Sequence, residues 1–269
     1  MQVHLKKQSF IKEKMSKKIA ICISGYLRTF EDCYPSIKEN LIQDYDCDIF
    51  IHTYDKIRSK PSYHNQDYYD RDKDYSLNLN FLEKIPNLKS LVIENFNDIK
   101  GKFLKFQKRL GIDYMPAVYM APYKIYKCNE LKKKYEKDNN FIYDLVIRTR
   151  GDQIFTKKIN FNFPGNRILI NSYPFGDEDY IHNCTEKEKS KTVGYLNDRF
   201  AAGSSENIDY LSDLYNHLKT YLVEPLFSPI ESLFYLHLEG KELEKRNLGF
   251  YVKHDPPKES CRLCGKNFN

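Results

Sequence analysis

Two arginines and an aspartate follow a hydrophobic run in YDLVIRTRGD, residues 143–152. A guanidinium group can bind two phosphate oxygens at once, so Arg148 and Arg150 could hold the diphosphate of a nucleotide. Asp152 could supply a hard oxygen ligand for a Mg²⁺ or Mn²⁺ ion that bridges those phosphates. Taken alone, the three residues would equally serve as ion-pair partners and a turn at the edge of a sheet.

Polar residues also follow two other hydrophobic runs, at residues 24–28 and 52–53. In an open α/β sheet, ligands bind beyond the carboxyl ends of the strands, because loops and helix N-termini converge there. We therefore expect the three polar segments to share one rim, which favours a nucleotide-binding site over isolated ion pairs. The candidate nucleotide-binding residues are Ser24, Gly25, Tyr26, Arg28, His52, Thr53, Arg148, Arg150 and Asp152, with Asp152 also the candidate metal ligand.

Hydrophobic patterns predict the elements that would carry these residues. Runs at 18–25 and 47–55 flank a helical pattern at 29–45, which makes a β-α-β unit. Further strands are predicted at 88–96, 141–152, 166–171 and 198–204, and helices at 121–137, 205–222 and 228–241. This alternation predicts an α/β fold, with a Rossmann-like, mostly parallel sheet flanked by helices in a single domain.

Several local signals refine the helices. Ser205 is expected to cap the helix at 205–222. Ser228 and Glu231 have the spacing of a capping box at the start of the helix at 228–241. Pro122 is expected in a first helical turn, where proline is tolerated. The lysine-rich run LKKKYEK, residues 131–137, is expected on a solvated helix face.

The two ends of the chain are predicted to lie outside the domain. Residues 1–17 form a charged leader that could be disordered, residues 18–255 form the domain, and residues 256–269 form a tail. Residues 56–80 contain few aliphatic side chains and are predicted to be a loop. Cys261 and Cys264 have the spacing of half a zinc site, but no second pair accompanies them, which favours two free thiols.

Composition limits the class of protein. The chain has 269 residues, 41% of them hydrophobic, which is enough for a sizeable core. The net charge of +6 gives only weak support for an anionic partner. No apolar run approaches the ~20 residues that a membrane helix needs, so we expect a cytoplasmic protein that could at most associate peripherally with a membrane. The seven scattered cysteines are typical of reduced thiols.

Five segments in order resemble small bacterial and viral glycosyltransferase-like proteins of GT-A fold from surface-polysaccharide gene clusters. The segments are IAICISGYLRTF, DIFIHTYD, YDLVIRTRGDQIF, NDRFAAGSSENIDYLSDLYNHL and SPIESLFYLHL, within residues 18–239. The resemblance implies a GT-A-like domain that transfers a sugar from a UDP-, GDP- or CMP-linked donor to a saccharide acceptor. It implies that Asp152 stands where such enzymes have an acidic metal-binding motif for Mn²⁺ or Mg²⁺. Here that segment is Arg150-Gly151-Asp152, so Arg148 or Arg150 could neutralise part of the donor charge.

Glycosyl transfer with inversion also needs a general base for the acceptor hydroxyl, and a carboxylate is the usual choice. Glu231 and Asp198 are the candidates. The capping box explains Glu231 equally well. Asp198 could instead orient the acceptor, hold an arginine or occupy a turn. His237 is expected to be a packing residue, and a role for His254 at a metal has little support.

Two other classes of function remain open. A nucleic-acid-binding module would use the excess of basic residues and the tyrosines, but most tyrosines fall at positions that a core would use, and the net charge is low for a duplex binder. We therefore expect no nucleic-acid partner. A metal-dependent phosphatase or nuclease would usually cluster several carboxylates and histidines at strand ends, where only Asp152 is found.

Overall fold

The computed structural model describes residues 17–56, 77–110, 116–171, 196–222 and 230–252. Within them the chain forms a seven-stranded sheet with the order β3-β2-β1-β4-β7-β6-β8 and a separate pair, β5-β9. The strands are β1 (Ile19–Ser24), β2 (Cys47–Tyr54), β3 (Leu88–Glu94), β4 (Leu145–Thr149), β5 (Gln153–Phe155), β6 (Ile168–Asn171), β7 (Phe200–Gly203), β8 (Leu243–Arg246) and β9 (Phe250–Val252).

The large sheet is mostly parallel. β1 pairs in parallel with both β2 and β4, and β2 pairs in parallel with β3. β7 runs antiparallel to β4 and to β6, while β6 and β8 are parallel to each other. β7 is therefore the strand that runs against the others in this sheet. The predicted α/β class and mostly parallel sheet flanked by helices are confirmed.

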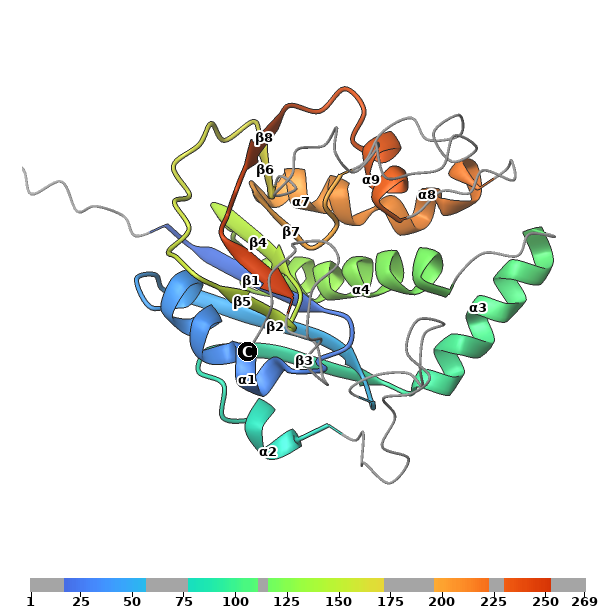
Figure 1. Ribbon diagram of the computed structural model, residues 1–269, viewed down its shortest axis with the longest axis horizontal. Helices are drawn as coiled ribbons and strands as arrows, with labels where there is room; N and C mark the ends of the chain where they lie inside the picture. Colours follow the sequence, from blue (N-terminus) through green and yellow to red (C-terminus); the bar gives the residue numbers. More distant parts are fainter. Residues whose placement is uncertain (1–16, 57–76, 111–115, 172–195, 223–229, 253–269) are drawn as a thin grey trace, which may run out of the picture.

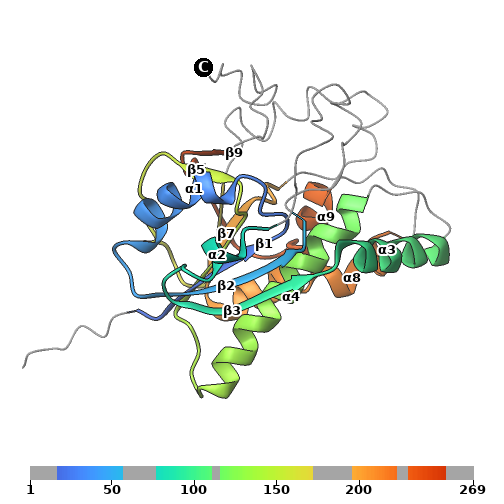
Figure 2. The same ribbon diagram turned by 90° about the horizontal axis from the view of Figure 1, so that it is seen from below.

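Helices cover both faces of the sheet (Figures 1 and 2). They are α1 (Phe30–Ile37), the π-helical turn η1 (Lys38–Ile42), α2 (Leu79–Leu82), α3 (Phe96–Leu110), α4 (Pro116–Asp138), α7 (Ser205–Ser212), α8 (Leu214–Tyr221) and α9 (Ile230–His237). α1 packs beside β5 on one face. α4 crosses β1 and β2 on the other face and contacts α7, α8 and α9.

Alternation of buried side chains along the strands divides the core in two. In β1, Ile21 and Ile23 belong to the cluster under α1, which also contains Phe30 and Phe155. Cys22 belongs to the cluster under α4, α7, α8 and α9. β1 is buried along its whole length and is almost continuously apolar, whereas the equally central β2 also carries Asp48, His52 and Thr53.

The predicted β-α-β unit at 18–55 is present as β1, α1 and β2, although its helix continues into the π-helical turn η1. α3 was not predicted, although Ile99, Phe103 and Phe106 follow a helical spacing. The sequence also failed to reveal β5, β8 and β9. α4 begins at Pro116, so Pro122 lies inside the helix and not in its first turn.

The helix predicted at 205–222 is two helices, which meet at Asp213. Its N-cap is Ser204, whose hydroxyl accepts a hydrogen bond from the Asn207 amide at 3.3 Å, so the prediction of Ser205 is wrong by one residue. The Ser205 side chain is buried instead, and its hydroxyl donates to Glu136 Oε1 at 2.8 Å.

One lysine of the LKKKYEK run is also placed differently from the prediction. Lys132 is fully buried and forms ion pairs with Glu136 at 3.0 Å and Asp209 at 2.7 Å, whereas Lys134 is exposed. These contacts join α4 to α7, so part of a run expected on a solvated face belongs to the core.

Several predictions fall outside the described residues: the leader except Lys17, most of the loop at 56–80, Ser228, His254 and the tail with Cys261 and Cys264. His237 is buried, as expected of a packing residue, and its Nε2 lies 2.7 Å from the Tyr210 carbonyl oxygen. Among the helices of the described part of the chain, none combines the length and apolar character needed to cross a bilayer.

Candidate functional site

The segments after β1 and β4 meet at one rim of the sheet. Ile23 near the end of β1 lies opposite Thr149 at the end of β4, which places the two following loops side by side. Arg28, in the loop after β1, donates from Nη1 to Asp152 Oδ2 at 3.2 Å. Two of the polar segments expected to converge are therefore in direct contact.

Asp152 is fully buried between two guanidinium groups. Besides its contact with Arg28, it accepts from Arg150 Nε at 2.9 Å and from Arg150 Nη2 at 2.6 Å. Burial works to raise the pKa of Asp152, but the positive charges of Arg150 and Arg28 outweigh it, and the pKa is lowered. The carboxylate is therefore ionised and holds both arginines in place.

The backbone after β1 is shaped for this contact. Gly25 has φ +104°, a conformation that residues with a Cβ rarely adopt, and its amide donates to the His52 carbonyl at 3.2 Å. Arg28 has φ +26°, which is uncommon for a residue other than glycine. Tyr26 packs on Tyr54 with ring centroids 4.7 Å apart, so the loop is anchored on the end of β2.

The end of β2 is polar but buried. Ser24 and His52 lie opposite each other, each about 3% exposed. Within the described residues, Ser24 Oγ, His52 Nδ1 and Thr53 Oγ1 have no hydrogen-bond partner. Burial, followed by the nearby charge of Lys124, lowers the pKa of His52 to about 3, so its imidazole is neutral.

Lys124 of α4 places a cation next to the end of β2. The sequence did not reveal this cation. Its Nζ donates to the Thr53 carbonyl at 2.7 Å and to Glu94 Oε2 at 2.8 Å, and lies 3.8 Å from the centroid of the Tyr54 ring. Burial lowers the pKa of Lys124 to about 8. A lysine on an amphipathic helix gives no sequence signal of such burial.

Arg148 is a buried cation of a different kind. It is 4% exposed, and its Nε has no hydrogen-bond acceptor within the described residues. Burial lowers its pKa to about 10, against the opposing effect of Asp198. No ion pair within 4.0 Å compensates its charge in the described part of the chain, which makes Arg148 suited to an anionic ligand.

The two candidate bases belong to one electrostatic group. Asp198 precedes β7 and Glu231 lies in the first turn of α9, and the Leu196 amide donates to the Glu231 carbonyl at 3.1 Å. Burial and then the charge of Asp198 raise the pKa of Glu231 to about 7, with Arg199 and Arg150 opposing. After Arg150 and Arg28, the positive charge of Arg199 also lowers the pKa of Asp152, and no sequence motif marks this residue.

The capping explanation for Glu231 cannot be compared with a Ser228 contact, because Ser228 lies outside the described residues. A helix N-terminus favours the ionised form of a carboxyl group, so the raised pKa of Glu231 comes from burial and Asp198 and not from capping. No family model matches the chain. No match was found among curated proteins either. The chemistry of the chain's own residues therefore carries the functional assignment.

The residues around Asp152 do not fit a divalent metal ion. Both carboxylate oxygens accept hydrogen bonds from arginines, and the side chain is fully buried. A cation at Asp152 would lie against Arg28 and Arg150. Within the described residues, no three His, Cys, Asp or Glu side chains are grouped so that they could hold a metal.

A small hollow, with a free volume of about 20 Å³, borders Arg28. It is lined by Leu27, Arg28, Phe30, Glu31, Leu77, Asn78, Phe81 and Leu82. The Arg28 side chain is 38% exposed, so its guanidinium can reach a ligand there while it remains in contact with Asp152. This volume has room for about one water molecule, so the hollow marks an exposed edge of Arg28 and is not a nucleotide-sized pocket.

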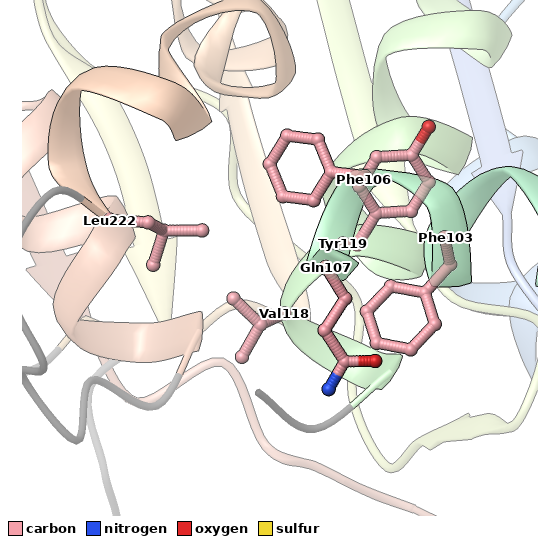
Figure 3. A pocket seen from close by; sticks show the side chains of 6 residues that line it. All are labelled: Phe103, Phe106, Gln107, Val118, Tyr119 and Leu222. Carbon is pink, nitrogen blue, oxygen red and sulfur yellow. The ribbon is translucent and has the colours of Figure 1, made fainter. Parts of the chain in front are cut away.

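A second hollow, too narrow for a water molecule, lies among α3, α4 and the residue after α8 (Figure 3). Its lining residues are Phe103, Phe106, Gln107, Val118, Tyr119 and Leu222. None of these residues belongs to the rim, and none is charged. This apolar hollow therefore lacks the groups that would bind a nucleotide or transfer a proton.

Proposed function

We propose that the protein is a glycosyltransferase that moves a sugar from a UDP-, GDP- or CMP-linked donor to a saccharide acceptor. The observation that carries the proposal is an arginine group at the carboxyl edge of the sheet that interacts electrostatically with Glu231, a carboxyl group with a raised pKa. Arg150 forms an ion pair with Asp152 and also interacts electrostatically with Asp198 and Glu231. The site can therefore hold an anionic leaving group close to a proton acceptor.

The roles follow from this arrangement. Arg28, Arg148 and Arg150 would bind donor phosphate oxygens, since guanidinium groups make charge-assisted hydrogen bonds to phosphate. Glu231, with a pKa of about 7, is suited to take the proton of an acceptor hydroxyl. The acceptor oxygen then forms a bond to the anomeric carbon, while the bond from that carbon to the phosphate oxygen breaks.

The sheet and the resemblance support a GT-A-like member of this class. The sheet is parallel apart from β7, and the polar residues lie at the carboxyl ends of β1 and β4, where ligands of open α/β sheets bind. The resemblance to surface-polysaccharide enzymes supports a saccharide as acceptor. A metal-dependent phosphatase has less support, because the described residues offer no cluster of metal ligands.

The proposal is tested by release of nucleotide from a panel of UDP-, GDP- and CMP-sugars with saccharide acceptors. Glu231→Gln should lower turnover strongly and leave the donor Kd close to that of the wild type, because a base acts on the acceptor proton. Glu239→Gln, at an exposed position just after α9, is the matched control and should keep full turnover. If no donor binds and none is consumed, the protein is not a glycosyltransferase.

A further inference from the structure

We infer that this site binds the phosphates of its donor with arginine side chains and no metal ion, and that Asp152 acts as a positioning residue for those arginines. The inference rests on the proposed function, because it concerns how the same donor is held. It assigns Asp152 a different role from the metal ligand that the sequence suggests.

The contacts of Asp152 are the first argument against a metal ion. Three hydrogen bonds from Arg28 and Arg150 occupy its two oxygens, and no part of the side chain is exposed. Since the carboxylate is fully buried beside these guanidinium groups, a metal ion would have to share it with two positive charges. It would also have to approach a carboxylate whose charge is already exceeded by those of the two arginines.

The second argument is that Arg28 keeps N–H donors for phosphate while it contacts Asp152. A guanidinium has five N–H donors, and Arg28 uses one of them on Asp152 at 3.2 Å, so donors remain for phosphate oxygens. The Arg28 side chain is 38% exposed, so these donors can be reached from the surface. The carboxylate therefore fixes the arginine and leaves it able to bind.

Arg148 provides an independent observation. Its side chain is more than nine-tenths buried, and its Nε lacks an acceptor within the described residues. Buried charges in proteins are normally paired, so a buried cation without a paired anion indicates a ligand that supplies the negative charge. Arg148 and Arg150 act electrostatically on each other, so one anion would stabilise both.

The first experiment is calorimetric titration of the full chain with UDP, GDP, CMP and inorganic pyrophosphate, in EDTA and in Mn²⁺. We expect at least one nucleotide to bind in EDTA with a Kd within about threefold of its value in Mn²⁺. Affinity should fall as salt rises, because charge pairs are screened. A nucleotide that binds in Mn²⁺ but more than about tenfold more weakly in EDTA would overturn the inference and leave the glycosyltransferase proposal standing. Absence of binding in both conditions would count against both.

The second experiment tests the positioning role. In EDTA, Asp152→Asn and Arg28→Ala should each raise the Kd by about tenfold or more, as expected when charge-assisted hydrogen bonds are lost. Arg167→Ala is the matched control, because Arg167 is also an exposed, ion-paired arginine but pairs with Glu244 beside β6 and β8. The nucleotide Kd of the Arg167→Ala variant should equal that of the wild type.

A metal-ligand role for Asp152 predicts a different pattern. Asp152→Asn would then weaken binding only in Mn²⁺ and leave the EDTA value unchanged, and that result would overturn the inference. If Asp152→Asn does not fold, the Arg28→Ala variant tests the inference by itself. A nucleotide Kd for Arg28→Ala in EDTA equal to that of the wild type would show that Arg28 does not bind phosphate.

Discussion

Replacement of Glu231 by glutamine should change the pH dependence of stability as well as the activity. Burial and the charge of Asp198 raise the pKa of Glu231 from 4.5 to about 7. Glutamine has nearly the same shape and does not titrate. The difference in unfolding free energy between variant and wild type therefore isolates this one carboxyl group.

Proton linkage gives the sign and the size of the change in unfolding free energy with pH. Below pH 4.5 the group is protonated in both states of the wild type, and its stabilising contribution is fully present. Between pH 4.5 and about 7 the unfolded chain loses the proton that the folded protein keeps, so rising pH favours unfolding. One pKa unit corresponds to about 1.4 kcal/mol, so the wild type should lose about 3 kcal/mol across this range, and Glu231→Gln should not.

Urea unfolding of both proteins at about pH 4 and about pH 8 measures this difference. The stability of Glu231→Gln relative to wild type should increase by about 3 kcal/mol between the two conditions. Asp198→Asn should reduce the effect, because it removes a charge that raises the pKa of Glu231. Glu239→Gln should show no such trend. A difference that stays constant with pH would mean that Glu231 titrates normally, and the argument for it as a base would fail.

Two further predictions concern the scaffold. Lys132→Met leaves two carboxylates without their cation and should lower the unfolding free energy by about 3–5 kcal/mol in urea, whereas Lys134→Met should change it by under about 1 kcal/mol. Equal effects would contradict the buried ion-pair network. Gly25→Ala should cost about 1–3 kcal/mol in the same assay, from backbone strain alone, because its surroundings are open. Gly101→Ala, in α3 and also in open surroundings, should be neutral or stabilising, and a similar loss there would refute the strain argument.

Much of the fold could be predicted from the sequence because the central strands are buried on both faces. The apolar runs of β1, β2 and β4 have few interpretations other than strands of a parallel sheet. Alternation with helices then predicts the layered α/β arrangement. The break at Asp213 could not be predicted because the apolar period continues through it, whereas the apolar period of α3 is visible in the sequence.

The candidate site, like the fold, could be predicted from the sequence only in part. Placing polar residues at the ends of β1 and β4 needs only the strand boundaries, and Arg28, Arg150 and Asp152 do lie together. The burial of Lys124 and Lys132 could not be predicted, because each depends on carboxylates supplied by other elements. A lysine on an amphipathic helix has the same sequence pattern in either environment.

The sequence by itself therefore determined which side chains stand at the carboxyl edge of the sheet. Only the tertiary structure decided their charge states and partners. Residues 28 and 152 are far apart in the chain, yet their contact turns a candidate metal ligand into an anchor for arginines. The pKa of Glu231 likewise depends on its burial and on the distance to Asp198. Electrostatic energies depend on separation in space and on solvent exposure, and neither quantity is set by position in the sequence.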